Sequence, residues 1–269
     1  MNQLRFGAHI PWAQIKTYLD LVLALKLAPE IAIKGPEFDT LDEELLDQAG
    51  QKIAAAQVRP SLHAPFFDLN PGALDPLIRQ ATRQRLTQAL TAAGRLNAHL
   101  MVIHPGVDKW RYPNLEQVWL VHAKEFLLPL IDQAAACGCR LAIENIYEDA
   151  PDLLVQLVDE IDSEWFGHCF DAGHWHLFGK TDMTAWLDAI GPRLLHLHLH
   201  DNHGIADEHL PVGEGTIDFS PLQNKLRNMS TLPSMTLEAH SAEHLKISLQ
   251  QVNKLFAPTS YRPDSPSSY

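Results

Sequence analysis

Histidine and leucine alternate from Leu195 to His200, so every second residue of this stretch is apolar. Alternation with a period of two is typical of a β-strand whose two faces have different surroundings. The face opposite the leucines carries imidazoles rather than the Ser, Thr or Lys of an ordinary half-exposed strand. The pattern predicts a strand of a closed parallel sheet, with leucines against helices and histidines facing the barrel interior. We expect His198, near the end of the strand, to bind a metal ion, and His196 to lie inside the barrel.

Eight short β-type runs occur along the chain, and each is followed by an amphipathic helical pattern. The β-type runs are Leu4–His9, Glu30–Lys34, Arg59–His63, Leu100–His104, Arg140–Glu144, Gly167–Asp171, Leu194–His198 and Ser234–Glu238. The helical patterns are Trp12–Ala28, Leu41–Gln57, Asp75–Asn97, Asn114–Ala136, Pro151–Ile161, Thr181–Ile190, Phe219–Asn228 and Ala242–Phe256. Eight β-then-α units predict an α/β fold, a single (β/α)8 TIM barrel. A doubly wound sheet is the alternative, but it would gather ligand groups at one crevice rather than on nearly every strand.

The predicted barrel occupies residues 1–256 as one domain. Residues 257–269 hold three prolines and four serines without periodicity, so we expect a flexible C-terminal tail.

Composition and charge restrict the cellular location and the partners that we expect for the protein. The chain has three cysteines, no secretory signal and no apolar run long enough for a membrane span, which predicts a cytoplasmic protein without a membrane partner. Its net charge of −12 argues against long nucleic acid as a partner, although bound divalent cations would add local positive charge. An oligomer is left open.

The last residues of six consecutive predicted strands are all of metal-ligating type. They are His63, His104, Glu144, Asp171, His198 and Glu238. Successive members lie 41, 40, 27, 27 and 40 residues apart, and each interval is long enough for one βα unit. Because the C-terminal ends of barrel strands converge on one pocket, we expect these side chains to meet.

Three loop residues extend the set to nine candidate metal ligands. His174 lies three residues after Asp171, and Asp207 and His209 form an Asp-x-His pair beyond the histidine strand. One zinc or manganese ion needs about four to six ligands, so nine donors predict two or three ions of Zn²⁺, or alternatively Mn²⁺, Co²⁺ or Mg²⁺. Glu144 and Glu238 can each bridge two ions and are the candidate catalytic residues.

A cluster of this kind suits phosphoryl chemistry, in which ions activate a water molecule and neutralise the phosphate and the departing oxygen. Interconversion of an aldose and a ketose needs fewer ions: one or two are enough, together with carboxylates that transfer protons.

Residues near the predicted mouth of the barrel are candidate substrate contacts. His200 and His240 lie beyond the metal-ligating positions, where solvated side chains are the alternative. Aromatic residues after the strand ends are expected to form a wall around the pocket, with simple loop packing as the alternative. The aromatic candidates are Trp12, Phe66 and Trp175, together with Phe67, Trp110, Tyr147 and Phe178.

Short motifs end or follow the predicted strands: Ser61–Pro65, Val102–Gly106, Ala142–Asn145, Phe170–His174, His198–Asp201, Asp207–His209 with Gly213–Gly215, and Thr236–Glu238. Together they resemble the strand ends of the xylose-isomerase-like TIM-barrel superfamily. That superfamily joins sugar-phosphate isomerases and epimerases to the endonuclease IV type of abasic-site nuclease (AP endonuclease family 2). The resemblance covers roughly residues 4 to 256.

The two branches of the superfamily imply different ligand sets. The nuclease branch implies three zinc sites, formed by His63, His104 and Glu144, by Asp171, His198 and Glu238 with Glu144 shared, and by His174, Asp207 and His209. The epimerase branch implies a smaller set, Glu144, Asp171, His198 and Glu238, with His174 contacting the substrate.

The chain departs from both branches. Residues Pro36–Asp39 are acidic where a DNA-reading loop would carry Arg, which argues against abasic DNA. The epimerases usually have an Arg after the histidine strand, where this chain has Asn202–Ile205.

Three hypotheses follow. The nine candidate ligands and the net negative charge favour a divalent-metal-dependent phosphoester hydrolase that acts on a phosphorylated metabolite. The alternative is a sugar or sugar-phosphate isomerase or epimerase that uses one or two ions. The third is a non-catalytic metal-stabilised barrel that functions by binding.

Overall fold

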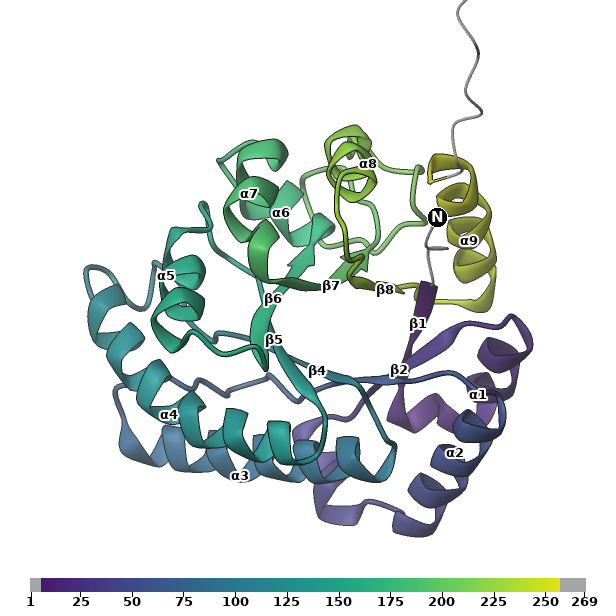
Figure 1. Ribbon diagram of the computed structural model, residues 1–269, viewed down its shortest axis with the longest axis horizontal. Helices are drawn as coiled ribbons and strands as arrows, with labels where there is room; N and C mark the ends of the chain where they lie inside the picture. The colour runs from purple at the N-terminus through teal and green to yellow at the C-terminus, as the bar shows by residue number, and fades with distance from the viewer. Residues whose placement is uncertain (1–5, 257–269) are drawn as a thin grey trace, which may run out of the picture.

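The computed structural model describes residues 6–256 and confirms the (β/α)8 barrel. Eight parallel strands form a closed ring in chain order, and β1 pairs with both β2 and β8 (Figure 1). The strands are β1 (Phe6–Pro11), β2 (Ala28–Ala32), β3 (Ser61–His63), β4 (Leu100–Ile103), β5 (Arg140–Glu144), β6 (Phe166–Asp171), β7 (Leu194–Leu199) and β8 (Ser234–Leu237).

Helices surround this ring, as Figure 1 shows. The α-helices are α1 (Ile15–Ala24), α2 (Glu43–Ala55), α3 (Pro76–Arg95), α4 (Glu116–Ala136), α5 (Asp152–Ile161), α6 (Ala172–Phe178), α7 (Met183–Ile190), α8 (Ser220–Arg227) and α9 (Ala242–Leu255). Three short 3-10 helices are η1 (Trp12–Gln14), η2 (Gly35–Thr40) and η3 (Gly191–Arg193). Asp42 and Asp75 cap α2 and α3, where their side chains accept the N–H groups of Leu45 and Leu77.

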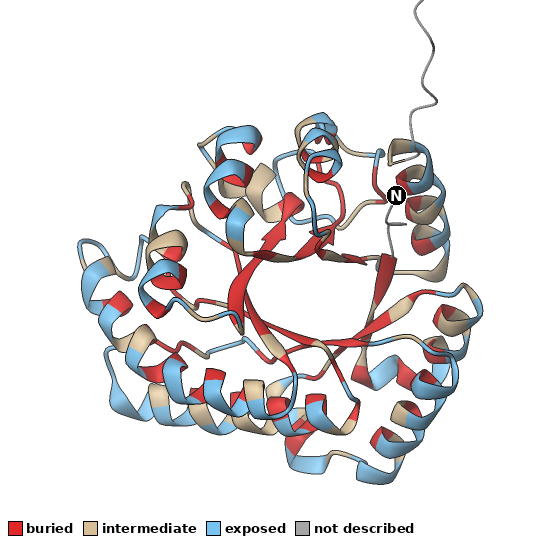
Figure 2. Ribbon diagram, viewed as in Figure 1, coloured by how far each residue is buried: buried red, intermediate tan, exposed pale blue. Residues whose placement is uncertain are grey.

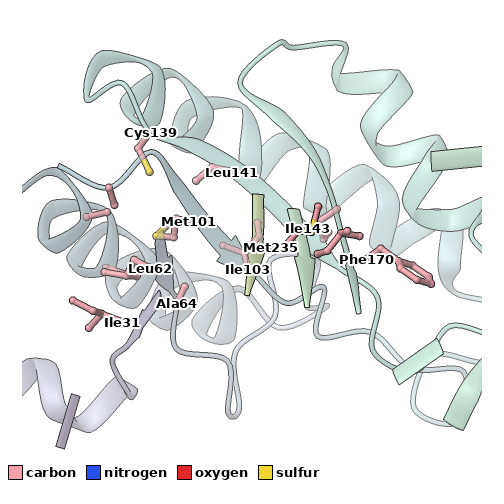
Figure 3. Close-up of a cluster of buried hydrophobic side chains, with 14 of the residues drawn as sticks. Ile31, Leu62, Ala64, Met101, Ile103, Cys139, Leu141, Ile143, Phe170 and Met235 are labelled. Atoms are coloured by element: carbon pink, nitrogen blue, oxygen red, sulfur yellow. The ribbon is translucent and has the colours of Figure 1, made fainter. Parts of the chain in front are cut away.

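The main hydrophobic core lies between the strands and the helices. Outward-facing side chains of neighbouring strands, such as Leu62, Met101 and Ile143, belong to one large buried cluster (Figure 3). The strands are buried along almost their whole length, whereas most helices bury one face and expose the other (Figure 2). The alternation of β7 follows this division, since Leu197 and Leu199 are in the core cluster and the histidines lie on the other face.

The inward-facing positions differ between the two halves of the ring. On β4 to β6 they form a small, separate apolar cluster of Leu100, Val102, Ala142 and Cys169. On β2, β3, β7 and β8 they are buried and polar: Glu30, Ser61, His196 and Thr236. His196 therefore lies in the barrel interior as expected.

The predicted bounds of the first two strands need correction. The run predicted as Glu30–Lys34 is β2, Ala28–Ala32, so Glu30 is in mid-strand rather than at its start. Pro29 lies inside this strand, where a residue without an N–H group is not expected, and it therefore obscured the strand's beginning. β1 extends to Pro11, two residues beyond the predicted end.

The pattern also missed one helix. Helix α6 follows β6 directly, and the side chain of Asp171 caps it by accepting the N–H of His174 at 2.6 Å. Seven residues are too few to show helical periodicity in the sequence. The predicted tail, residues 257–269, lies outside the described residues.

Within residues 6–256, none of the helices combines the length and apolar character that crossing a membrane requires.

We predict that Gly7→Ala will destabilise the closure of the barrel. Gly7 pairs with Ala28 of β2 and Thr236 of β8, and an added Cβ would lie 2.6 Å from the Ala28 carbonyl oxygen. The free energy of unfolding should fall by about 1–3 kcal/mol. Gly94→Ala in α3 is the matched control, because its Cβ would meet nothing nearer than 3.9 Å and should stabilise the helix by about 0.5–1 kcal/mol. Denaturant unfolding measures both, and equal effects of the two changes would contradict the prediction.

Candidate metal centre

The carboxylate of Glu144, at the end of β5, lies between two pairs of histidines. Its Oε2 atom lies 3.3 Å from Nε2 of His63 and 3.0 Å from Nε2 of His104. Its Oε1 atom lies 3.0 Å from Nδ1 of His198 and 3.3 Å from Nδ1 of His174. The two oxygens of one buried carboxylate thus face two different groups of imidazoles.

Two further carboxylates complete the group around His198. Its Nδ1 atom lies 3.4 Å from Oε1 of Glu238 and 3.8 Å from Oδ2 of Asp171. The pairing of β6 with β7 places Asp171 directly beside His198 in the register. All three side chains are buried.

A third group continues from the second toward the solvent. Nε2 of His174 lies 3.5 Å from Oδ2 of Asp207, and the same oxygen lies 3.1 Å from Nε2 of His209. Nδ1 of His209 lies 3.6 Å from Oε2 of Glu238. The structure therefore brings all nine sequence-predicted ligand candidates into one connected cluster at the C-terminal mouth of the barrel.

Charge pairing keeps the carboxylates of the cluster ionised. Burial alone would raise the pKa of Glu144, but nearby imidazoles, His198 foremost, hold that pKa well below its ordinary value. Burial also opposes ionisation of Asp171, yet His174 and other histidines lower its pKa to about 2. Both side chains can therefore serve as anionic ligands near neutral pH.

Two of the imidazoles show the opposite effect, whereas burial holds the pKa of His104 below its ordinary value. Burial alone would lower the pKa of His174, but Asp171 and other carboxylates raise it well above its ordinary value. Burial likewise acts against protonation of His209, while its hydrogen bond to Asp207 and the charge of Glu238 raise its pKa to about 9. Binding of a cation would replace these protons.

Two buried ring nitrogens in or beside the cluster lack partners, which fits a cation site. Among residues 6–256, Nδ1 of the ligand candidate His209 and Nδ1 of the neighbouring His200 are buried without a hydrogen-bond partner. Buried polar atoms are rarely left in this state in proteins. Triads such as His63, His104 and Glu144 each offer one ligand atom per residue within 4.8 Å of one another. Mixed imidazole and carboxylate donors suit zinc, manganese or cobalt.

Asp201 fixes the loop that carries Asp207 and His209. Its buried carboxylate accepts the N–H groups of Asn202 at 2.9 Å, Gly213 at 3.0 Å and Ile217 at 3.1 Å. Gly213 has a φ of +88°, a backbone conformation that favours glycine. The hydrogen bond from the Gly213 N–H and the positive φ of this residue account for a glycine at the start of the Gly213–Gly215 motif.

The candidate substrate contacts fall into different environments. Phe66 is 36% exposed and its ring stacks on His104 at 4.2 Å between centroids, so it borders the cluster. His240 is exposed and stacks on His209 at 4.5 Å. His200 is not at the rim: it is buried, and its Nε2 lies 3.2 Å from Oδ2 of Asp171.

Two aromatic candidates are placed by packing. Trp12 is buried and belongs to the hydrophobic core cluster. Trp175 is partly buried near Phe170, and its indole N–H donates to the Thr181 carbonyl oxygen at 2.9 Å. Contact of either ring with a substrate stays a prediction.

Two inward-facing residues beside the cluster, Glu30 and His9, were not predicted as part of the site. Glu30 is completely buried, and its Oε1 lies 2.9 Å from Nε2 of His198. His9 on β1 lies 3.6 Å from Oε1 of Glu238. The period-two alternation of β2 would have revealed Glu30 if that strand had been given its correct bounds.

Comparison with known proteins identifies the family. A family model described as xylose isomerase-like TIM barrel matches residues 27–255, which is most of the chain. The protein therefore belongs to the xylose isomerase-like TIM barrel family.

Two sequence relatives differ in what their names state. The uncharacterized protein MJ1311 of Methanocaldococcus jannaschii is 31% identical over 215 residues, covering 75% of this chain and 73% of that protein. The probable endonuclease 4 of Mycoplasma genitalium is 25% identical over 174 residues, covering 60% of each chain.

Two solved structures share nearly the whole fold. The TTHB071 protein from Thermus thermophilus, in a structure from soaking with zinc chloride, is 27% identical with a TM-score of 0.82, and the match covers 94% of this chain and 98% of that one. A D-tagatose 3-epimerase-like protein is 25% identical with a TM-score of 0.79, and the match covers 94% of this chain and 100% of the other.

The raised pKa of His209 predicts a pH dependence of stability in protein stripped of metal by a chelator. A histidine whose pKa is about 9 when folded and about 6.5 when unfolded stabilises the fold fully below pH 6.5. That contribution should be lost as pH rises through about 9. The His209→Gln variant should show a flatter profile over this interval, measured as the free energy of unfolding at each pH. Identical profiles for the two proteins would show that His209 is not held as a cation.

Proposed function

We propose that the protein is a divalent-metal-dependent phosphoester hydrolase, whose site holds two or three ions and acts on a small phosphorylated metabolite. One observation carries this proposal: the two oxygens of Glu144 face separate groups of imidazoles. A carboxylate placed in this way is suited to bridge two cations. A single ion in the group around His198 would leave His63 and His104, on the far side of Glu144, without a role as ligands.

Each proposed ion has its own group of donors. His63, His104 and Glu144 would hold the first; Asp171, His198 and Glu238, with Glu144 shared, would hold the second; and His174, Asp207 and His209 would hold a third. Zinc is the preferred ion, with manganese, cobalt or magnesium as alternatives. Bound there, such ions would supply activation of water and neutralisation of charge on the phosphoester.

The chain's own residues would position the substrate around these donors. The carboxylates of Glu144 and Glu238 would keep the bound cations in place while the phosphoester reacts. This is the catalytic role that we assign to them. Phe66 stacks on His104 of the first group and His240 stacks on His209 of the third, so both would contact the part of the substrate outside the cluster. His200 would orient Asp171 rather than contact the substrate.

A small or medium substrate fits the charge of the protein better than a long nucleic acid. The net charge is −12. The acidic residues of Pro36–Asp39 are also engaged within the fold, since Asp39 pairs with Arg85 at 2.7 Å and Glu37 accepts the Lys34 N–H at 2.6 Å. We therefore propose a metabolite, without long nucleic acid as a partner.

A sugar epimerase or isomerase is the second candidate. The likeness to a D-tagatose 3-epimerase-like protein favours it, and the group around His198 contains the four donors that the resemblance implied for epimerases. This reaction would need only that group, with carboxylates moving a proton at a substrate carbon.

Removing the donors on the far side of Glu144 separates the two candidates. In the His63→Ala/His104→Ala double variant, a hydrolase loses one ion, so phosphate release should fall roughly 100-fold or more, because one ion's charge stabilisation contributes several kcal/mol. An epimerase would keep its four-donor group and most of its turnover. The assay measures phosphate release from a panel of phosphoesters, and hydrogen exchange with solvent at substrate carbons for a panel of ketoses.

His122→Ala is the matched control, since His122 lies on α4 and its Nδ1 contacts Arg79 rather than any of the nine candidate ligands. The proposal of hydrolysis is wrong, and epimerisation is favoured, if the double variant still exchanges hydrogen at ketose carbons while neither it nor the unaltered protein releases phosphate.

A further inference from the structure

We propose that Glu30 is a positioning residue that orients His198 as a metal ligand through the ring nitrogen facing away from the ion. The two nitrogens of His198 lie between two carboxylates on different strands. Nε2 lies 2.9 Å from Oε1 of Glu30, and Nδ1 lies 3.0 Å from Oε1 of Glu144. The inference rests on the proposed metal site but not on the reaction catalysed there.

The chemistry of imidazole makes this arrangement consequential. A neutral ring carries one N–H, and only the other nitrogen has a lone pair for a cation. A carboxylate beside Nε2 keeps the proton on that atom, so that Nδ1, on the side of Glu144 and Glu238, becomes the ligand. Metal-binding histidines commonly donate their second N–H to such a partner, which also raises the basicity of the ligand.

Glu30 is held so that one oxygen is reserved for His198. Its Oε2 atom accepts hydrogen bonds from Ser61 Oγ at 2.7 Å and Thr236 Oγ1 at 3.2 Å. The same oxygen lies 3.0 Å from Nε2 of His196. Three partners from β3, β7 and β8 thus fix the carboxylate from one side.

The other oxygen has only His198 within reach as a strong partner. Among residues 6–256, Glu30 Oε1 and His198 Nε2 are both buried; they lie 2.9 Å apart, but neither atom makes a hydrogen bond of good angular geometry, and the second nearest imidazole, Nδ1 of His9, is 3.8 Å from that oxygen. Glu30 and His198 are fully shielded from solvent. Water cannot take the place of either group, so each depends on the other.

This placement explains why a charged residue is tolerated in the middle of β2. An isolated carboxylate inside a barrel would be costly to bury. Here the charge is compensated by two hydroxyl donors and two imidazoles, and the arrangement lies directly below the metal-ligand group. The polar half of the barrel interior therefore serves as a support for one ligand.

The test uses full-length zinc-loaded protein and the variants Glu30→Gln and Glu30→Ala. Zinc affinity is measured by competition with a chromophoric chelator, and zinc content by elemental analysis. We expect Glu30→Ala to weaken the affinity of the ion bound by His198 about 10- to 100-fold. Glu30→Gln should weaken it less, because its amide oxygen still accepts the Nε2–H although the charge is lost.

Nuclear magnetic resonance of ¹⁵N-histidine-labelled, zinc-loaded protein reports which nitrogen of His198 binds zinc and which carries the proton. A purely structural role of Glu30 would leave both unchanged. The His198 signals, assigned with a His198→Asn variant, should show zinc on Nδ1 and a slowly exchanging proton on Nε2. That proton should shift and exchange faster in Glu30→Ala. If Glu30→Ala does not fold, as judged by circular dichroism, the isosteric Glu30→Gln variant carries the test.

Glu160→Gln is the control. This carboxylate lies on α5 and pairs with Lys124 at 3.1 Å rather than with any of the nine candidate ligands, so zinc affinity should be unchanged. The inference is overturned if zinc coordinates Nε2 of His198, if both Glu30 variants bind zinc with unchanged affinity, or if they lose a whole ion because Glu30 is itself a ligand. Absence of zinc binding by the unaltered protein would instead overturn the proposed metal site.

Discussion

Mutual compensation of buried charge at the mouth of the barrel is the interaction on which the rest of the structure depends. Five imidazoles and four carboxylates lie within ion-pairing distance of one another in a largely buried cluster. Any one of these carboxylates would be costly to bury alone. Closing the ring brings them together from the ends of six strands, from helix α6 and from the loop after β7, so that each charge finds a partner. The same compensation makes the cluster competent to exchange protons for cations.

Ring closure and the local loop structure contribute in different ways to this cluster. The strands set the positions of donors such as Glu144 and Asp171 through the parallel register. The third group depends instead on a loop, which Asp201 fixes with three backbone hydrogen bonds. The inner candidates are therefore held by the barrel itself, whereas Asp207 and His209 are held by the hydrogen bonds of one loop.

Most of the fold could be predicted from the sequence, because eight alternations of strand and helix patterns leave few architectures. The convergence of the strand-end ligand candidates could also be predicted, since the C-terminal ends of parallel barrel strands meet at one mouth; their roles as metal ligands stay a prediction. Glu30 could not, because Pro29 hid the beginning of β2 and made a mid-strand residue look like a strand start. The burial of His200 and Trp12 was equally invisible, since residues just beyond a strand can turn inward or outward and the pattern does not distinguish these cases. Helix α6 was missed because it is shorter than the window in which helical periodicity shows.

We propose that Glu144 would lie between two bound cations. Anomalous diffraction from zinc-loaded crystals, recorded above and below the zinc absorption edge, measures where the ions bind. We expect at least two peaks, one on the side of His63 and His104 and one on the side of His198. A single peak beside His198, Asp171 and Glu238, with His63 and His104 free of metal, would contradict it.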